Sequence, residues 1–169
     1  MSNDVLVIIT ETNDAGLAQS AVEALGAASD LAGKTGGNVS ALVTKGSAAS
    51  DAGGYGPSTV HAFEEAPSNE GLLATASALI AEQEPAAVIV NRGPVVLELV
   101  PRLAARTSGA SVTGVVEMTV DGGEIGATAA VFGGAALAQY KFDAEGPVIL
   151  TMAPGAVEQP EQSTSSAMK

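Results

Sequence analysis

The sequence contains no cysteine and no tryptophan, and only seven of its 169 residues are lysine or arginine. Without cysteine the chain has no disulfide, no thiolate metal site and no redox-active thiol. Its net charge of −12 argues against a nucleic-acid partner, because phosphate binding requires clustered cations. The same charge argues against an anionic membrane surface and favours a partner with a basic face.

Long apolar runs are also missing. No run approaches the ~20 residues of a membrane span, and residues 1–4 lack the basic region of an export signal, so we expect a cytoplasmic protein. Aromatic residues make up only 3% of the chain, so the core must be built from valine, leucine, isoleucine and alanine. The length favours one domain, which we place at residues 1–157. From Pro154 onward the composition predicts a solvated tail, and residues 158–169 form its disordered, linker-like part.

Residues 86–109 organise the expected fold. The apolar run at 86–90 predicts a strand buried on both faces, and residues 91–94 have turn chemistry. Helically spaced apolar residues follow. We expect this helix to begin near Leu97 or Glu98, because Pro101 lacks an N–H and is tolerated only in the first turn. A strand that leads directly into a helix is half of a βαβ unit.

The rest of the chain predicts two more helices and several strands, in the order βαββαβα followed by an extended β section. The first helix carries Leu17 on its apolar face and is capped by Asn13 or Asp14, and the second is capped by Ser68 or Asn69. The remaining predictions are buried parallel strands at residues 5–9, 39–43 and 148–152, a loop at 46–57 that could include one short helical turn, an edge strand at 59–63, a hairpin joining 111–120 to 125–131, and an extended segment at 137–142.

Three stretches occur in a characteristic order. They are VLVI at residues 5–8, LVPRLAAR at residues 99–106, and VFGGAALA at residues 131–138, which leads to GPVILTMAPGA at residues 146–156. With these stretches the chain resembles, from residue 5 to residue 157, the N-terminal domain of the electron transfer flavoprotein alpha subunit.

The resemblance implies a three-layer α/β sandwich with a mostly parallel, adenine-nucleotide-hydrolase-like (Rossmann-like) sheet, extended by an antiparallel hairpin section. It also implies pairing with a beta-type electron transfer flavoprotein subunit. In the family, FAD is held by a second domain that follows the linker. We therefore expect no cofactor on this chain alone and FAD in the assembled complex. Either the chain is a standalone relative, or the FAD-binding domain is encoded or expressed separately.

Arg92 and Gly93 are the candidate cofactor-binding residues. A phosphate group requires free N–H groups at a glycine-containing turn between a strand and a helix, and Arg92 is the one cation of the turn at 91–94. Pro94 removes a donor from this turn, so a turn without a ligand is the alternative. A bound nucleotide would make the chain a standalone small-molecule module that takes AMP or ATP at the mouth of the sheet.

Five residues are candidates for a partner interface. Arg102 and Arg106 share a helix face and could meet carboxylates on another chain, although helix-end stabilisation also explains Arg106. Gly133 and Gly134 indicate a bulge or a close backbone approach, which the resemblance makes part of a domain contact. Tyr140 belongs to an aromatic strand face, which is either core or a partner surface.

No catalytic or metal-binding residue is predicted. His61 is the only histidine and has apolar neighbours in sequence, and the acidic pair Glu64 and Glu65 is expected to be a solvated strand exit. Together with the absence of such a site, the resemblance implies a non-catalytic electron-transfer or scaffold subunit that positions a flavin held elsewhere. Self-association through a face left without its partner is a further alternative.

Overall fold

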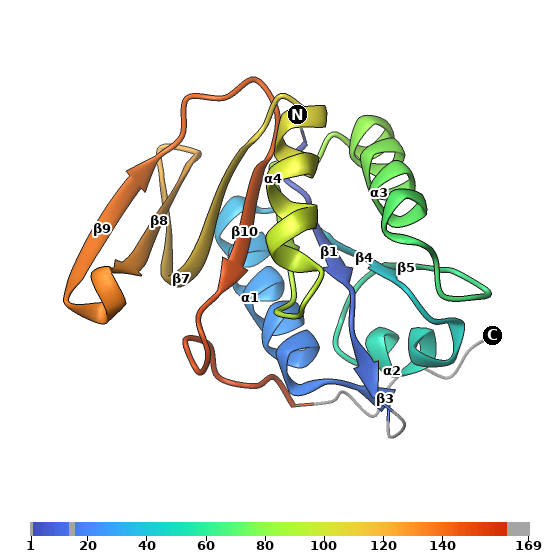
Figure 1. The fold of residues 1–169 in the computed structure, drawn as a ribbon. Coiled ribbons are helices and arrows are strands. Elements are labelled where there is room, and N and C mark those ends of the chain that lie inside the picture. Colours follow the sequence, from blue (N-terminus) through green and yellow to red (C-terminus); the bar gives the residue numbers. More distant parts are fainter. Residues whose placement is uncertain (1, 14–15, 162–169) are drawn as a thin grey trace.

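The computed structural model describes residues 2–13 and 16–161, and an eight-stranded sheet runs through it (Figure 1). The strand order is β5-β4-β1-β6-β10-β7-β8-β9. Every pair from β5 to β7 is parallel, whereas β8 and β9 are antiparallel to their neighbours. The strands are β1 (Val5–Ile9), β4 (Val39–Val43), β5 (Thr59–Ala62), β6 (Ala87–Val90), β7 (Ala110–Asp121), β8 (Glu124–Val131), β9 (Ala136–Lys141) and β10 (Val148–Met152).

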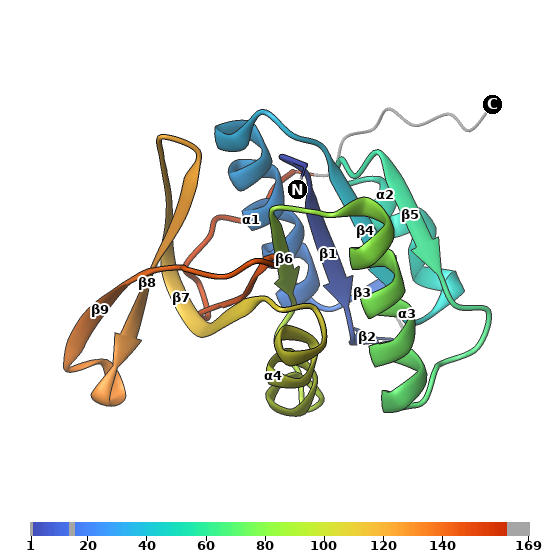
Figure 2. The ribbon, with the colours of Figure 1, turned by 90° about the horizontal axis from the view of Figure 1, so that it is seen from above.

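Helices cover both faces of the parallel part and make three layers, as Figure 2 shows. Helix α1 (Gln19–Thr35) and the short α2 (Ala49–Gly53) pack on one face, and α3 (Asn69–Gln83) and α4 (Val96–Arg106) pack on the other. Alternate residues of β1 pack on opposite faces of the sheet. Val5 and Val7 belong to the core on the α1 side, and Leu6 belongs to the core beneath α3 and α4. The predicted three-layer α/β sandwich with a mostly parallel sheet is confirmed.

Several predicted elements are present at their predicted positions. The runs at 5–9, 39–43 and 148–152 are the fully or largely buried strands β1, β4 and β10. The edge strand at 59–63 is β5, and the hairpin is β7 and β8 joined at residues 122–123. Ser68 caps α3, because its Oγ accepts a hydrogen bond from the backbone N–H of Gly71 at 3.2 Å.

The start of α1 was predicted wrongly. Leu17 lies in β3 (Gly16–Leu17), which pairs antiparallel with β2 (Thr12–Asn13), so the helix begins only at Gln19. Its N-cap is Ala18, which makes no side-chain cap, so Asn13 does not cap the helix. Asp14 lies outside the described residues. The hairpin of β2 and β3 therefore contains residues that the apolar spacing had assigned to the first turn of α1.

The segment at 46–57 contains the short helical turn that the predicted loop allows. It contains a 3-10 turn (Gly46–Ala48) followed by α2. Ala48 and Ala52 are buried against the same core as α1, and Tyr55 packs beside them. Small side chains let this segment lie close to the sheet, and their lack of apolar periodicity left the bounds of the helix unpredicted.

Helix α4 begins earlier than predicted. Its first residue is Val96, so Pro101 stands beyond the first turn and cannot donate to the carbonyl four residues before it. That carbonyl belongs to Leu97, whose side chain is 79% exposed, so the interrupted turn lies at the surface. Burial of Val96 and Leu99 fixes the start of the helix, and this packing outweighs the preference of proline for the first turn.

The strands β7, β8 and β9 form an antiparallel extension that projects away from the helices (Figures 1 and 2). A bulge between Val115 and Glu117 separates this extension from the parallel part of the sheet. No helix among the described residues has the length and apolar character needed to cross a membrane.

The C-terminal segment (residues 156–161) crosses α1 and differs from the solvated tail that composition predicted. Ala156 and Val157 pack against the core beneath it. Gly26 of α1 leaves room for Pro160, because a Cβ at residue 26 would lie 2.8 Å from the proline Cδ. Residues 162–169 of the predicted tail lie outside the described residues, and the domain limit at residue 157 stays a prediction.

Candidate functional site

The carboxyl ends of β1 and β6 lie side by side in the sheet. The chain leaves β1 toward α1 on one face and leaves β6 toward α4 on the other face. In open α/β sheets such a divergence is the usual place for a ligand. The candidate functional site is therefore built from residues that follow these two strands and from the first turns of α1.

Asn91 joins the two strands at this edge. Only 1% of it is exposed, and its Oδ1 accepts hydrogen bonds from the backbone N–H of Thr10 at 2.7 Å and from the Thr10 hydroxyl at 3.0 Å. Its Nδ2 donates to Ser20 Oγ at 3.1 Å and to the carbonyl of Arg92 at 3.3 Å. The amide thus holds β1, α1 and the turn after β6 together.

Arg92 forms an ion pair with Glu23 of α1. The Nη2–Oε2 distance is 2.6 Å, and the two side chains differ in burial, since Arg92 is 36% exposed and Glu23 only 4%. The other carboxylate oxygen of Glu23 accepts a hydrogen bond from Gln19 Nε2 at 3.1 Å. The charge of Arg92, which sequence reasoning assigned to a phosphate, is therefore balanced within the chain.

Gly93 lies beneath a second carboxylate. A Cβ at this residue would be 2.9 Å from Cδ of Glu11, so the Glu11 side chain covers the backbone that a phosphate would approach. Two acidic side chains and a neutralised arginine make this edge a poor anion site. Phosphate binding by Arg92 and Gly93 stays a prediction, and the geometry around both residues weighs against it.

Sequence reasoning missed Glu23 and Asn91. Glu23 stands within a helix whose other buried residues are apolar, and its only available signal was an acid four residues after Gln19. Asn91 was treated as turn chemistry, although an amide directly after a buried strand is a signal for a strand-joining hydrogen bond. Their partners are 69 and 81 residues away in sequence, so local patterns could not identify them.

The two arginines of α4 have different surroundings. Arg102 bonds Glu98 Oε1 at 2.6 Å and also pairs with Glu70 of α3, so it ties the two helices together. The hydrogen bond from Arg102 lowers the pKa of Glu70, and the same bond raises the pKa of Arg102. Arg106 makes no ion pair among the described residues.

Gly133 and Gly134 form a turn between β8 and β9. Their φ angles are 65° and 90°, in the region that glycine adopts readily. A Cβ at either residue would meet nothing within 4 Å, so no other described residue closely approaches this turn. The predicted contact of the two glycines with a partner stays a prediction. Tyr140 is half-buried and lies across from Ala127, on the core-facing side of β9.

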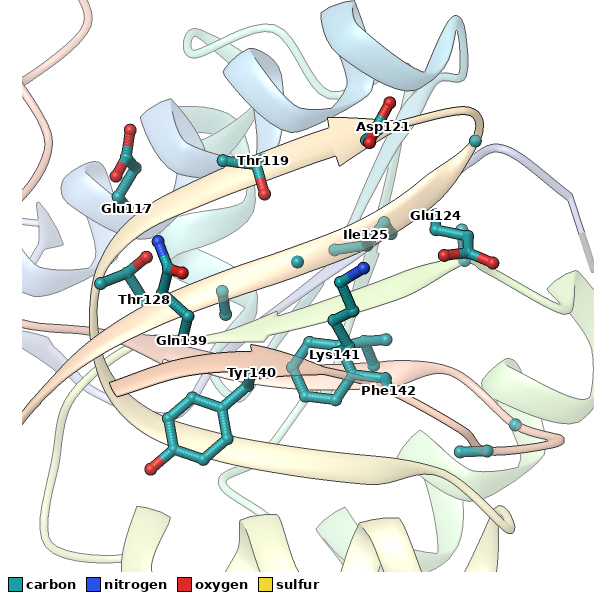
Figure 3. Close-up of a pocket in the computed structure, with 17 residues that line it drawn as sticks. Glu117, Thr119, Asp121, Glu124, Ile125, Thr128, Gln139, Tyr140, Lys141 and Phe142 are labelled. Atoms are coloured by element: carbon teal, nitrogen blue, oxygen red, sulfur yellow. The ribbon is translucent and has the colours of Figure 1, made fainter. Parts of the chain in front are cut away.

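A hollow of about 380 Å³ lies on the antiparallel extension (Figure 3). Carboxylates of Glu117, Asp121 and Glu124 line it together with Lys141, and Figure 3 shows Tyr140 pointing away from Lys141. Among residues 2–13 and 16–161, no group of three or more histidine, cysteine or acidic side chains is arranged to hold a metal ion.

His61 lies on the edge strand β5. Its Nε2 is 3.2 Å from the side-chain amide nitrogen of Gln83 at the end of α3. This contact joins the strand to the helix.

Comparison with known families gives one result for the whole chain. Residues 5–169 match the family described as the electron transfer flavoprotein domain. A search of curated proteins finds no match. The chain therefore belongs to the electron transfer flavoprotein domain family.

Proposed function

We propose that this chain is a non-catalytic subunit or domain of an electron transfer flavoprotein-like complex. It pairs with a beta-type subunit and positions a flavin that is held elsewhere, and it binds no cofactor alone. The observation that carries this proposal is the family match over residues 5–169. The matched family transfers electrons, and the parallel sheet of this chain supplies a rigid body on which a partner can dock.

The geometry of the carboxyl edge supports placing the flavin on another domain. The pyrophosphate of a dinucleotide requires a free cation or uncovered backbone N–H groups. Here Glu23 neutralises Arg92 and Glu11 covers Gly93, so the residues present do not fit the phosphates of FAD. The separate FAD-binding domain or chain expected from the family would supply that site.

The predicted partner contacts divide into two groups. Arg102 is engaged with Glu70 and Glu98, which leaves Arg106 as the cation of α4 that can reach a partner. Gly133, Gly134 and Tyr140 instead lie on the antiparallel extension, which Figure 1 shows apart from α4. We place the partner contacts mainly on the extension, because its turn and outer strand project away from the helices.

Co-expression with a beta-type subunit tests the proposal. We expect the two chains to co-purify in equal amounts, and we expect the chain purified alone to be colourless. A yellow chromophore that stays with this chain through gel filtration contradicts the proposal, as does failure of the two subunits to associate. Neighbouring genes offer a second check, since a beta-type reading frame is expected beside this one.

The alternative function is a standalone nucleotide-binding module. The divergence of the chain after β1 and β6 favours it, because this is where such sheets bind ligands. Calorimetry with AMP, ADP and ATP tests it directly. We expect no binding below millimolar concentrations. Tight binding of any of the three, abolished by Arg92→Gln, would support the alternative instead.

A further inference from the structure

The hollow on the antiparallel extension is lined by acidic groups that the chain leaves unpaired. Glu117, Asp121 and Glu124 contribute their carboxylates to it. None of the three forms an ion pair or a side-chain hydrogen bond with another residue in the described part of the chain. At the carboxyl edge of the sheet, in contrast, Glu23 is paired with Arg92. The hollow therefore offers hydrogen-bond acceptors that no described side chain uses.

The register of β7 and β8 places these groups on one face of the extension. Three directly opposed pairs share that face: Glu117 and Thr128, Thr119 and Gly126, and Asp121 and Glu124. Gly126 contributes no side chain to the middle pair, and a Cβ there would be 2.7 Å from Thr119 Oγ1. Glu117 and Asp121 are four residues apart on one strand, which separates their Cα atoms by ~13 Å. Carboxylates thus lie toward both ends of this face, with space at Gly126 between them.

Thr128 is the buried polar residue of the hollow. It is 7% exposed, and its hydroxyl makes no hydrogen bond with the described residues. Every described side-chain oxygen that is fully closed off from open space has a partner, so this hydroxyl opens into the hollow. Figure 3 shows it beside Gln139, its neighbour on β9. A hydrogen-bond donor bound in the hollow would satisfy this buried group.

Charge and polarity indicate the class of ligand. Lys141 also lines the hollow, opposite Gly126, so three carboxylates and one ammonium group give the lining a net charge of −2. Carboxylates only accept hydrogen bonds and alkylammonium groups only donate them, so a ligand with two ammonium groups matches both charge and hydrogen bonding. Ile125 and Phe142 add apolar surface to the lining, which suits a hydrocarbon chain between the two charges.

We propose that this hollow binds a linear aliphatic diamine. One ammonium group lies between Glu117 and Thr128, and the other lies at the end formed by Asp121 and Glu124. The hydrocarbon chain crosses the space above Gly126.

This binding site goes beyond the proposed function and does not depend on it, because it requires only the purified chain. It is also separate from the turn at residues 132–134, where we place a partner contact. That turn follows Val131, which pairs with Ala136 at one end of the β8–β9 ladder, whereas Gly126 and Lys141 form the last pair at the other end.

Isothermal titration calorimetry of the purified chain tests the proposal. The probes are 1,8-diaminooctane and octylamine, which have the same hydrocarbon chain but differ in the second ammonium group. We expect one diamine to bind per chain, about fivefold or more tightly than octylamine, because only the diamine reaches carboxylates at both ends. Equal affinities for the two amines, or no saturable binding of the diamine, would overturn the proposal.

Matched variants locate the bound diamine. Glu117→Gln removes a carboxylate from the hollow, and the control Glu82→Gln removes an exposed one from α3, so both change the net charge by one. We expect Glu117→Gln to weaken diamine binding about threefold or more and Glu82→Gln to leave it unchanged. Thr128→Val keeps the side-chain shape without the hydroxyl and should also weaken binding. Equal weakening by the two glutamate variants, or unchanged binding by Thr128→Val, contradicts the proposed site.

Discussion

Removing either half of the Glu23–Arg92 ion pair is expected to destabilise the protein unequally. Arg92→Met leaves a carboxylate that is 4% exposed and has only Gln19 as a polar partner within the described part of the chain. Glu23→Gln instead leaves a guanidinium that is 36% exposed and can turn toward water. We expect the larger loss of stability from the substitution that leaves the more deeply buried charge without its partner.

The magnitudes follow from this difference in burial. An uncompensated buried charge costs about 3–5 kcal/mol, which we assign to Arg92→Met. Water screens the exposed guanidinium in Glu23→Gln, so its cost should be about 1–2 kcal/mol. In the double variant no charge stays buried, so its stability should be close to that of Glu23→Gln alone. The coupling energy between the two sites would then equal the cost of Arg92→Met alone, about 3–5 kcal/mol.

Urea unfolding followed by far-ultraviolet circular dichroism measures these differences. With a slope of about 2 kcal/mol per molar urea, Arg92→Met lowers the midpoint by about 1.5–2.5 M and Glu23→Gln by about 0.5–1 M. The control is Asp30→Asn, which breaks the exposed Asp30–Lys34 pair and should cost about 0.5 kcal/mol or less. If Arg92→Met costs no more than Glu23→Gln, the reasoning from burial is refuted.

Three further perturbations test other parts of the structure. Gly26→Ala should release the C-terminal segment to protease, because the new methyl group would clash with it, whereas Gly33→Ala on the same helix meets nothing within 4 Å and should leave cleavage unchanged. Ser68→Ala should lower the urea-unfolding free energy by about 1 kcal/mol through loss of the α3 cap, and no change would contradict that cap. Because Arg102 lowers the pKa of Glu70, the stabilisation from this carboxylate is present above its ordinary pKa and is lost as pH falls through the lowered value. Arg102→Gln should therefore raise the Glu70 pKa toward its ordinary value in a carboxyl NMR titration, and an unchanged titration would contradict the pairing.

Sequence patterns predicted the parallel core because its strands carry their signal locally. The runs at 5–9 and 148–152 are unbroken and rich in β-branched residues, as strands covered on both faces require. The hairpin of β7 and β8 was predictable from its glycine turn. In contrast, β2 and β3 have two residues each, which is too short for any periodicity.

Tertiary packing determined the bounds of the two helices that sequence patterns left imprecise. Pro101 should mark a first turn by its own chemistry, but burial of the apolar residues around it extends α4 toward Val96. The α2 segment consists of small and polar residues, and it is helical because Ala52 fits against the sheet. Neither contact can be inferred from nearby residues, since each depends on the final strand order.

The candidate site also depends on contacts that cannot be inferred from nearby residues in the sequence. The turn at Arg92 and Gly93 has the composition of an anion site, and the fold brings it to the edge where ligands bind. However, the same fold also brings Glu23 and Glu11 there from the β1 side of the sheet. A cation and a glycine in a turn therefore indicate an anion site only when no carboxylate from the neighbouring strand reaches them. In this chain the polar groups of that edge are paired with one another and stabilise the fold, so its composition alone does not make it a ligand site.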